Sequence, residues 1–173
     1  LSEFDAKYDF VGNDGDVLYF LTDADAPRGR LIAVDRRSPD RSSWRTVVPE
    51  ADATLLSATY VGGRMFASYL RDARSEVRVF APSGAALGLV PLPGTGTAAG
   101  FGGSADDVET FYTFSGYARP GEIIRYEIAT GRTAVLRRPK LAFDPDRFVT
   151  EQIFATSKDG TKVPMFVTRR KDL

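Results

Sequence analysis

Short runs of apolar residues recur along the chain, and Gly, Pro, Asp and Asn stand between them. The runs are rich in Val, Ile, Tyr and Phe, and no long stretch has apolar residues at helical spacing. This pattern predicts short strands and an all-β fold. Three of the runs resemble one another and begin 46 residues apart, at Arg30–Val34, Glu76–Phe80 and Glu122–Tyr126.

Three more strands accompany each member of this repeat. The strand before it is expected at Val17–Phe20, Met65–Tyr69 and Thr110–Phe114. An opening strand is expected near Tyr8–Val11, Ser57–Val61 and Ala98–Phe101, and a shorter closing strand at Thr46–Val48, Leu89–Val90 and Thr133–Leu136. Four strands per repeat with a period in the mid-forties are typical of β-propeller blades. Residues 1–139 are therefore predicted to form about three four-stranded blades of a partial propeller, because a closed ring needs about four to eight.

After residue 139 the repeat ends, and residues 140–173 are predicted to begin a different domain. The stretch 143–146 is rich in Pro and Asp, as connectors between structural units are. Two apolar runs, Glu151–Thr156 and Lys162–Val167, flank a segment that ends in Asp-Gly, a strong hairpin signal. We therefore predict a connector followed by a β-hairpin.

Charge and hydropathy exclude several functions. Lys and Arg together number 23, as do Asp and Glu, so nothing favours nucleic acid or an anionic membrane as a partner. No apolar run approaches the roughly 18 residues needed to span a bilayer. The basic clusters Arg36–Arg37 and Arg169–Lys171 are interpreted as solvated surface, because acidic residues are interspersed throughout. A soluble protein is expected, and its compartment, cytoplasm or periplasm, stays open.

The chain contains neither cysteine nor histidine. A Ser-His-Asp triad therefore cannot be assembled from this chain alone, and no residue is assigned a catalytic role. The nucleophile-elbow pattern is absent, because Asp106 stands where the last Gly is needed in the stretch Gly102–Asp106. Ser104 within that stretch is expected to be a turn residue.

No cofactor or metal site is predicted either. The glycines of Gly94–Gly100 have the wrong spacing for a dinucleotide fingerprint, so this stretch is expected to connect two blades. The acidic pairs Asp14/Asp16, Asp23/Asp25 and Asp106/Asp107 lack the spacing of an EF-hand loop and are interpreted as solvated turns.

Three stretches in the last third of the chain stand out, and they are Pro120–Gly131, Phe143–Asp146 and Ser157–Phe166. Together they resemble the run that joins the propeller to the peptidase domain in the prolyl oligopeptidase family. The resemblance is close over residues 109–170. Before residue 109 it rests on the blade pattern and on stretches such as Tyr8–Val11. One departure is Ala155-Thr156, where family members carry an aromatic-Pro pair, and it lies outside any catalytic motif.

The resemblance implies that the full protein is a serine endopeptidase that cleaves short peptides after proline. In this family an α/β-hydrolase domain sits under a seven-bladed propeller that restricts access to small, flexible substrates. Residues 1–139 would then be the C-terminal part of the propeller, and residues 140–173 a connector and the first β-hairpin of the α/β-hydrolase domain. The catalytic serine, aspartate and histidine would lie downstream of Leu173, so this segment alone should be inactive. Its implied partners are short proline-containing peptides and the missing blades and peptidase domain of the same chain.

The implied role of this segment is to gate and size-select substrates, with Leu141–Phe148 as one of the strands of chain about which the two domains separate. A non-enzymatic β-propeller binding scaffold stays an alternative, although the hairpin marks a second domain. A sister peptidase, similar to oligopeptidase B or to the dipeptidyl and acylaminoacyl peptidases, is another. The abrupt ends at Leu1–Asp5 and Arg169–Leu173 are expected to be cuts in a longer polypeptide. The isolated segment should be unstable, because two apolar sheet faces would be uncovered.

Overall fold

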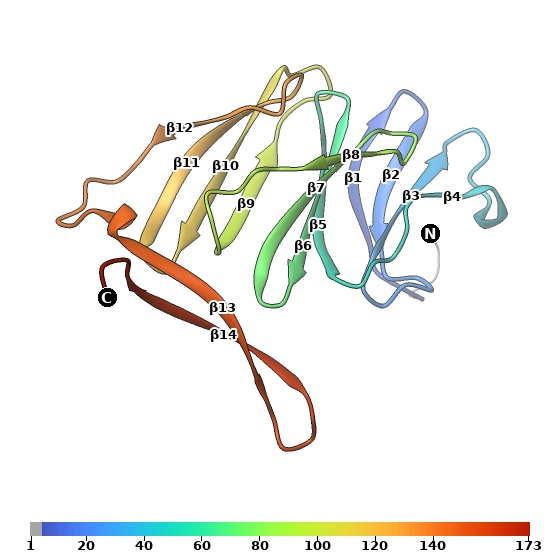
Figure 1. Cartoon of the computed structure of the whole chain (residues 1–173). Coiled ribbons are helices and arrows are strands. Elements are labelled where there is room, and N and C mark those ends of the chain that lie inside the picture. The colour runs from blue at the N-terminus through green and yellow to red at the C-terminus, as the bar shows by residue number, and fades with distance from the viewer. Residues whose placement is uncertain (1–4) are drawn as a thin grey trace.

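Three four-stranded antiparallel sheets follow one another along the chain and stand side by side (Figure 1). The computed structural model describes residues 5–173, so the expectation about the start of the chain falls largely on Leu1–Phe4, outside the described residues. In each sheet the strands pair in the order in which they occur in the sequence. The prediction of an all-β chain with four strands per repeat is therefore confirmed.

The strand boundaries define the three sheets and one separate hairpin. The first sheet contains β1 (Tyr8–Asp14), β2 (Val17–Thr22), β3 (Arg30–Asp35) and β4 (Arg45–Val48). The second contains β5 (Thr54–Val61), β6 (Arg64–Arg71), β7 (Arg74–Phe80) and β8 (Ala86–Leu89). The third contains β9 (Thr97–Gly102), β10 (Glu109–Gly116), β11 (Arg119–Glu127) and β12 (Thr133–Arg137). The hairpin consists of β13 (Phe148–Thr156) and β14 (Lys162–Arg170), and two short 3-10 turns are η1 (Arg41–Ser43) and η2 (Pro145–Arg147).

One strand boundary differs from the sequence-based expectation, and one turn was not predicted. The closing strand of the second sheet is Ala86–Leu89, so Val90 lies beyond its end, although its amide still donates to the Val77 carbonyl at 2.9 Å. The turn between β6 and β7 consists of Asp72 and Ala73, both with positive φ, at 49° and 62°. A two-residue turn of this kind normally carries Asn-Gly or Asp-Gly, and the Asp-Ala pair lacks that signal.

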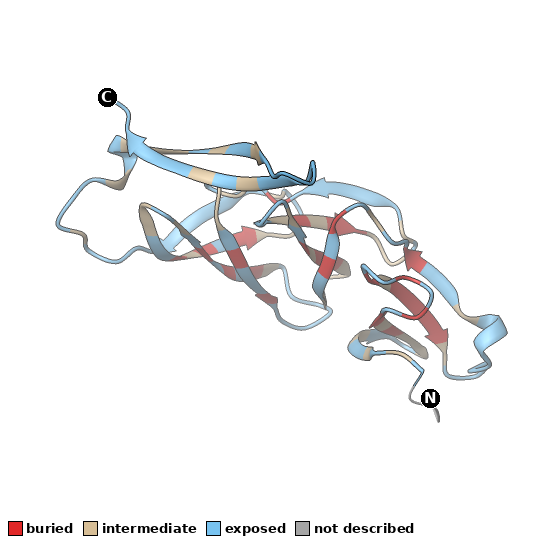
Figure 2. Cartoon of the chain, turned by 90° about the horizontal axis from the view of Figure 1, so that it is seen from below, coloured by how far each residue is buried: buried red, intermediate tan, exposed pale blue. Residues whose placement is uncertain are grey.

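The second sheet is buried on both faces. On β6, Met65 and Ala67 belong to the apolar cluster shared with the first sheet, which includes Leu31. Phe66 lies between them in sequence and belongs to the cluster shared with the third sheet, which includes Ile124. Because successive strand residues point to opposite faces, a strand buried on both sides needs a continuous apolar run. Buried residues accordingly gather in the three sheets and not in the hairpin (Figure 2).

An aromatic stack fills the space between the second and third sheets. The Phe101 ring lies between Phe66, at 5.3 Å between centroids, and Tyr112, at 4.7 Å, and both pairs are nearly parallel. Tyr126 meets Phe66 edge-on at 5.3 Å. Burial, and to a smaller extent the neighbouring Tyr126, raises the pKa of Tyr112 to about 12. The phenol of Tyr112 is therefore neutral near pH 7, as a group inside an apolar stack must be.

Each sheet has a β-bulge at the same place in its first strand. The register of the first strand against the second skips one residue, which is Val11 in β1, Leu56 in β5 and Phe101 in β9. These residues are 45 positions apart, and the three strands that carry them lie next to one another. A bulge increases the local twist of a strand, so its recurrence gives the three sheets the same shape at their common inner edge.

The two outermost sheet faces differ in polarity. Seven residues of the first sheet and its β3–β4 segment line an apolar groove of about 200 Å³, and they are Tyr8, Leu18, Phe20, Ile32, Val34, Pro39 and Trp44. Trp44 partly covers this groove, and its Nε1 donates to the Pro39 carbonyl at 2.9 Å. The outer face of the third sheet mixes the polar residues Thr113, Ser115 and Arg125 with Phe111, which is 39% exposed. Large apolar side chains are thus exposed on both outermost faces, and the instability of the isolated segment stays a prediction.

Replacing Phe66 with alanine should lower the free energy of unfolding by about 3–5 kcal/mol, because it removes a ring from a site that cannot refill. Leu89→Ala provides the matched control on the same sheet, since Leu89 is 62% exposed and its truncation should cost under about 1 kcal/mol. Urea unfolding of both variants measures the difference. Equal losses in the two variants would contradict the assignment of Phe66 to the core.

Candidate functional site

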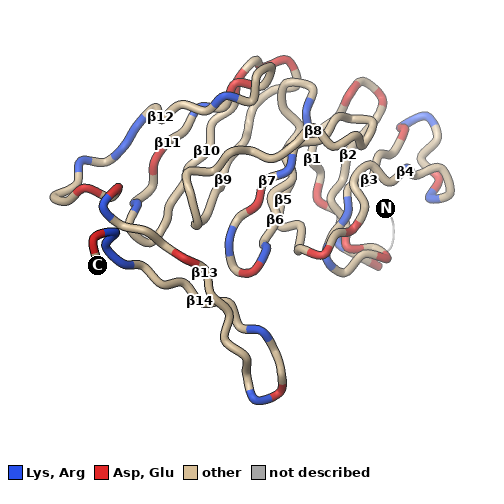
Figure 3. Tube along the Cα trace, viewed as in Figure 1, with Lys and Arg blue, Asp and Glu red and all other residues tan. Residues whose placement is uncertain are grey.

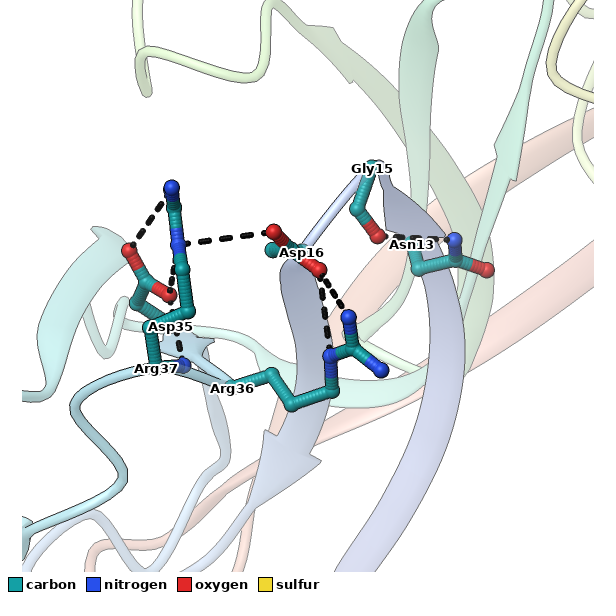
Figure 4. Close-up of polar contacts among 6 residues, drawn as sticks. All are labelled: Asn13, Gly15, Asp16, Asp35, Arg36 and Arg37. Carbon is teal, nitrogen blue, oxygen red and sulfur yellow. Dashed lines mark hydrogen bonds and ion pairs between the residues drawn. The ribbon is translucent and has the colours of Figure 1, made fainter.

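Acidic and basic residues are interspersed along the described part of the chain (Figure 3). The Arg36–Arg37 cluster at the end of β3 meets two carboxylates (Figure 4). Arg36 Nη2 lies 2.5 Å from Asp16 Oδ1, and Arg37 Nε lies 3.3 Å from Asp35 Oδ1 and 3.4 Å from Asp16 Oδ2. Hydrogen bonds from the amide and side chain of Arg37 hold the pKa of Asp35 below its usual value. The cluster therefore ties β3 to the β1–β2 turn instead of forming an unpaired basic patch.

The stretch Gly102–Asp106, which lacks the last glycine of a nucleophile elbow, makes contacts between the second and third sheets. Ser104 begins a turn in the β9–β10 loop, and its amide donates to Asp107 Oδ2 at 2.7 Å. Its carbonyl accepts from the Gly62 amide at 3.0 Å, across the boundary between the second and third sheets. Gly62 is required there, since a Cβ would lie 2.4 Å from the Asp107 carbonyl oxygen. These contacts position the loops between the two sheets and place Ser104 in a turn, as expected.

The glycine-rich stretch connects β8 to β9 through Gly94–Gly96, whereas Thr97–Gly100 belongs to β9. The Gly96 carbonyl accepts from the Ser75 amide at 3.0 Å, and a Cβ on Gly96 would lie 2.1 Å from the Ser115 carbonyl oxygen. Close approach to the neighbouring strand β10 of the same sheet therefore explains this glycine, and no helix follows the stretch.

The acidic pairs are dispersed over the surface. Asp23 accepts from the Lys7 amide at 2.7 Å, and Asp25 lies 3.6 Å from Arg30. Within residues 5–173, no group of three or more acidic side chains is placed to hold a metal ion. The same described part of the chain has no helix that is long and apolar enough to cross a membrane.

The candidate functional site is the place where the connector leaves the third sheet. Glu122 of β11 is 1% exposed; its Oε1 accepts a hydrogen bond from Arg119 Nη1 at 3.2 Å and forms an ion pair with Arg138, whose Nε lies 2.8 Å away. The other amino group of Arg119 pairs with Asp146 in η2. We call these residues the anchor cluster, and they are Arg119, Glu122, Arg138 and Asp146. The cluster fastens the connector to the third sheet through charge.

The electrostatics of the anchor cluster depend on Glu122. A buried carboxylate is costly unless ion pairs and hydrogen bonds compensate for the lost water. Two guanidinium groups supply that compensation at Oε1, whereas Oε2 is buried without a hydrogen-bond partner. Arg119 is thus held at one end by a buried charge and at the other by Asp146. This arrangement fixes the direction in which Arg119 reaches the connector.

The connector itself is shaped by local contacts. The Asp144 side chain accepts from the Asp146 amide at 2.9 Å and caps η2, which Pro145 begins. At the base of the hairpin, the Lys171 amide donates to the Arg147 carbonyl at 2.8 Å. A cavity of about 240 Å³ separates the connector from the third sheet, with Phe114 on its wall. The connector is therefore held at a few points and is not packed along its length.

The hairpin lies below the lower ends of the third and second sheets in the view of Figure 1. Gln152 Nε2 of β13 donates to the Asp72 carbonyl in the β6–β7 turn at 2.5 Å. The Phe166 ring of β14 meets the Tyr117 ring from the β10–β11 turn at 5.2 Å. A cavity of about 300 Å³ lies beside this second contact.

Sequence reasoning assigned none of these residues to a site. One signal was present, since Glu122 alternates with Ile124 and Tyr126 along β11, and both of those are buried. A carboxylate in the buried register of a strand indicates a charged partner, although not which one. The contact between Gln152 and Asp72 joins residues 80 positions apart and left no local signal.

Glu122→Gln should lower the free energy of unfolding by about 1–3 kcal/mol, because both arginines lose their counter-charge while remaining partly solvated. Glu109→Gln is the matched control on the neighbouring strand. Glu109 pairs with Arg125 at 3.5 Å and both side chains are at least 40% exposed, so its loss should cost less than about 0.5 kcal/mol. Thermal unfolding compares them, and a control as damaging as Glu122→Gln would refute the special role of the buried carboxylate.

Comparison with known proteins places this geometry in a family. The chain matches the profile described as "Prolyl oligopeptidase, N-terminal beta-propeller domain" over residues 1–139. It is 38% identical, over its whole length, to the prolyl endopeptidase of Elizabethkingia meningoseptica, of which it covers 24%. It is 33% identical, over 99% of its length, to the dual function macrocyclase-peptidase of Galerina marginata, again covering 24% of that protein. The chain thus spans about a quarter of the length of the curated relatives it matches.

Solved structures agree with the sequence comparison. One comes from a study of two prolyl endopeptidases and the role of inter-domain dynamics in their catalysis and specificity; it superimposes with a TM-score of 0.87 at 41% identity, covering all of this chain and 26% of that one. Prolyl oligopeptidase B from Galerina marginata, in its apo form, gives a TM-score of 0.88 at 31% identity, covering 99% of this chain and 25% of that one. The same enzyme bound to a 35mer hydrolysis and macrocyclization substrate gives 0.83. With a propeller profile matched over residues 1–139 and four-stranded sheets in sequence order, the chain belongs to the prolyl oligopeptidase family and contains a segment of its β-propeller.

Proposed function

We propose that this chain is part of a serine endopeptidase that cleaves short peptides on the carboxyl side of proline. Within that enzyme, residues 1–139 are the last blades of the propeller, and residues 140–173 are the connector and the first β-hairpin of the α/β-hydrolase domain. The catalytic serine, aspartate and histidine lie on chain outside these residues. This segment contributes the wall that selects substrates by size and the attachment about which the enzyme opens.

The main support for the proposal is that residues 140–173 do not continue the four-stranded repeat and form a separate hairpin instead. Among the described residues, strands β13 and β14 pair only with each other, and an isolated two-stranded hairpin is marginally stable at best. One face of the hairpin exposes three large side chains, Ile153, Met165 and Val167, at 43%, 42% and 41%. Such a face needs a further structural unit to cover it. The first hairpin of a second domain would be covered in this way by the rest of that domain. Support also comes from the prolyl endopeptidase match, which covers the hairpin as well as the sheets.

Gating follows from attaching one domain to another by a narrow piece of chain. A transient gap between two domains admits an extended peptide and excludes a folded protein, and lid or domain opening of this kind often limits turnover. Leu141–Phe148 is mostly exposed, and the pairing of Arg119 with Asp146 ties it to the third sheet. We therefore assign Leu141–Phe148 to the hinge.

A sister peptidase of the same superfamily is the competing function. It has the same two-domain organisation, and its specificity pocket lies mostly in the peptidase domain, outside this chain. Substrate preference, rather than the presence of hydrolysis, therefore distinguishes the two.

The complete polypeptide that carries this chain should hydrolyse a chromogenic peptide with proline before the scissile bond, and residues 1–173 alone should not, because the chain has no histidine to act as general base. The same peptide with arginine or alanine in place of proline is the control substrate. Release of the chromophore by both proteins, followed side by side, measures the difference. Faster cleavage after arginine would favour the sister peptidase, and no cleavage of any peptide by the complete polypeptide would refute the enzyme.

Covalent fixation of the hinge should slow turnover several-fold without changing which peptides are cleaved. Cysteines replacing Arg119 and Asp146, whose side chains meet as an ion pair, can be joined by a short reductant-cleavable crosslinker, and this chain contributes no cysteine of its own. Cleaving the linker should restore turnover. The control linker joins positions Glu109 and Arg125, paired within one sheet, and should leave turnover unchanged. Equal turnover with the Arg119–Asp146 linker intact and cleaved would eliminate Leu141–Phe148 as the hinge.

A further inference from the structure

We propose that the hairpin is also fastened to the ends of the second and third sheets by a latch, made of Gln152 on the Asp72 carbonyl and Phe166 on Tyr117, and that this latch sets how often the two domains separate. The inference rests on the proposed two-domain function and adds a regulatory contact to it. The latch is distinct from the hinge. The latch joins the hairpin to the ends of the second and third sheets, whereas the hinge is attached only to the third sheet, through the pairing of Arg119 with Asp146.

One face of the hairpin makes both latch contacts. Gln152 and Phe166 are directly opposite each other in the β13–β14 register, so their side chains point to the same side. Both are partly buried, whereas Ile153 and Met165, the next opposed pair along the hairpin, point to the other side and are exposed. The hairpin therefore presents one face to the propeller and leaves the other to a different partner.

The receiving turn on the second sheet is held in an unusual conformation. Asp72 and Ala73 both have positive φ, and an alanine in this region costs about 1 kcal/mol or more relative to an ordinary backbone. Local strain of this kind persists only where the surroundings fix it, and it is concentrated at binding and switch regions. Here the strained turn directs the Asp72 carbonyl to Gln152.

A charge network on both sides of the turn supplies that support. Arg71, the residue before the turn, makes two hydrogen bonds to Asp52, at 2.6 and 3.0 Å, and lies 3.1 Å from Glu76. Glu76 in turn pairs with Arg78 at 2.7 Å, and the Arg78 guanidinium lies 4.3 Å from the centroid of the Tyr69 ring. Hydrogen bonding from Arg71 holds the pKa of Asp52 below its usual value, so the network is charged at neutral pH. Ion pairs on both sides of the turn therefore hold its conformation in place.

The latch is small enough to open. It consists of one hydrogen bond and one aromatic contact beside a cavity of about 300 Å³, and Tyr117 is 64% exposed. Loss of one hydrogen bond typically changes a two-state ratio by about fivefold. Removing either contact should therefore shift the balance between latched and separated forms by a measurable amount without unfolding a sheet.

Domain separation in the complete polypeptide can be measured as the distance between two spin labels by pulsed electron–electron double resonance. One label is placed at Lys158, in the hairpin turn, and the other at Asp106, in the β9–β10 loop. Gln152→Ala and Tyr117→Ala should each raise the population at the longer distance, relative to the population at the shorter distance, about fivefold. The double variant should raise this population ratio further. Asp72→Asn is the matched control, because it keeps the backbone carbonyl and a residue that tolerates positive φ. Glu151→Ala, on the opposite face of β13, is a second control. Both controls should resemble the parent protein.

Unchanged distances in both single variants would overturn the latch, whether or not the polypeptide cleaves peptides. A shift in the Asp72→Asn control equal to that in Gln152→Ala would also overturn it, because the side chain and not the carbonyl would then be the contact. A shift confined to the latch variants in a polypeptide that cleaves no proline-containing peptide would support the latch and refute the proposed enzyme. The two ideas therefore fail separately.

Discussion

Burial of both faces of a four-stranded sheet is the constraint on which this structure depends. The second sheet satisfies it by lying between the other two, with Met65 and Phe66 pointing in opposite directions into separate clusters. A single sheet of this size has no interior of its own, so apolar area removed from water between sheets is the main source of stability. The recurring bulges at Val11, Leu56 and Phe101 give neighbouring sheets the same local twist at their inner edges.

The same constraint explains which parts of the fold the sequence predicts. Doubly buried strands require continuous apolar runs, and turns such as the one at Gly62 require residues that accept positive φ, so strands and most turns are visible as patterns. The bulge at Phe101 left no such pattern, because the residue has φ of 65° and yet is a large buried aromatic. Its strain is offset by stacking against Phe66 and Tyr112, which lie on other strands. Tertiary packing outweighs local preference at this position.

The candidate site was less predictable than the fold for a related reason. Its contacts join side chains whose separation in sequence is large, such as Gln152 and Asp72, and each residue is ordinary in its local context. Composition limited the possible chemistry, because a chain without histidine holds no triad, and the family resemblance located the connector near Asp146. Only the three-dimensional structure shows that the buried charge of Glu122 directs Arg119 toward that connector.

Two kinds of interface therefore coexist in one short segment, and their difference determines where motion is least costly. Between the sheets, close-packed rings such as Phe66 and Phe101 leave no room for sliding, because any displacement loses many contacts together. Between the sheets and the hairpin, the contacts are few and partly charged, and cavities of about 240 and 300 Å³ lie beside them. Regions with few buried apolar contacts open at lower free energy than the core. A force that pulls on the hairpin should consequently break its contacts with the sheets first and leave the sheets intact.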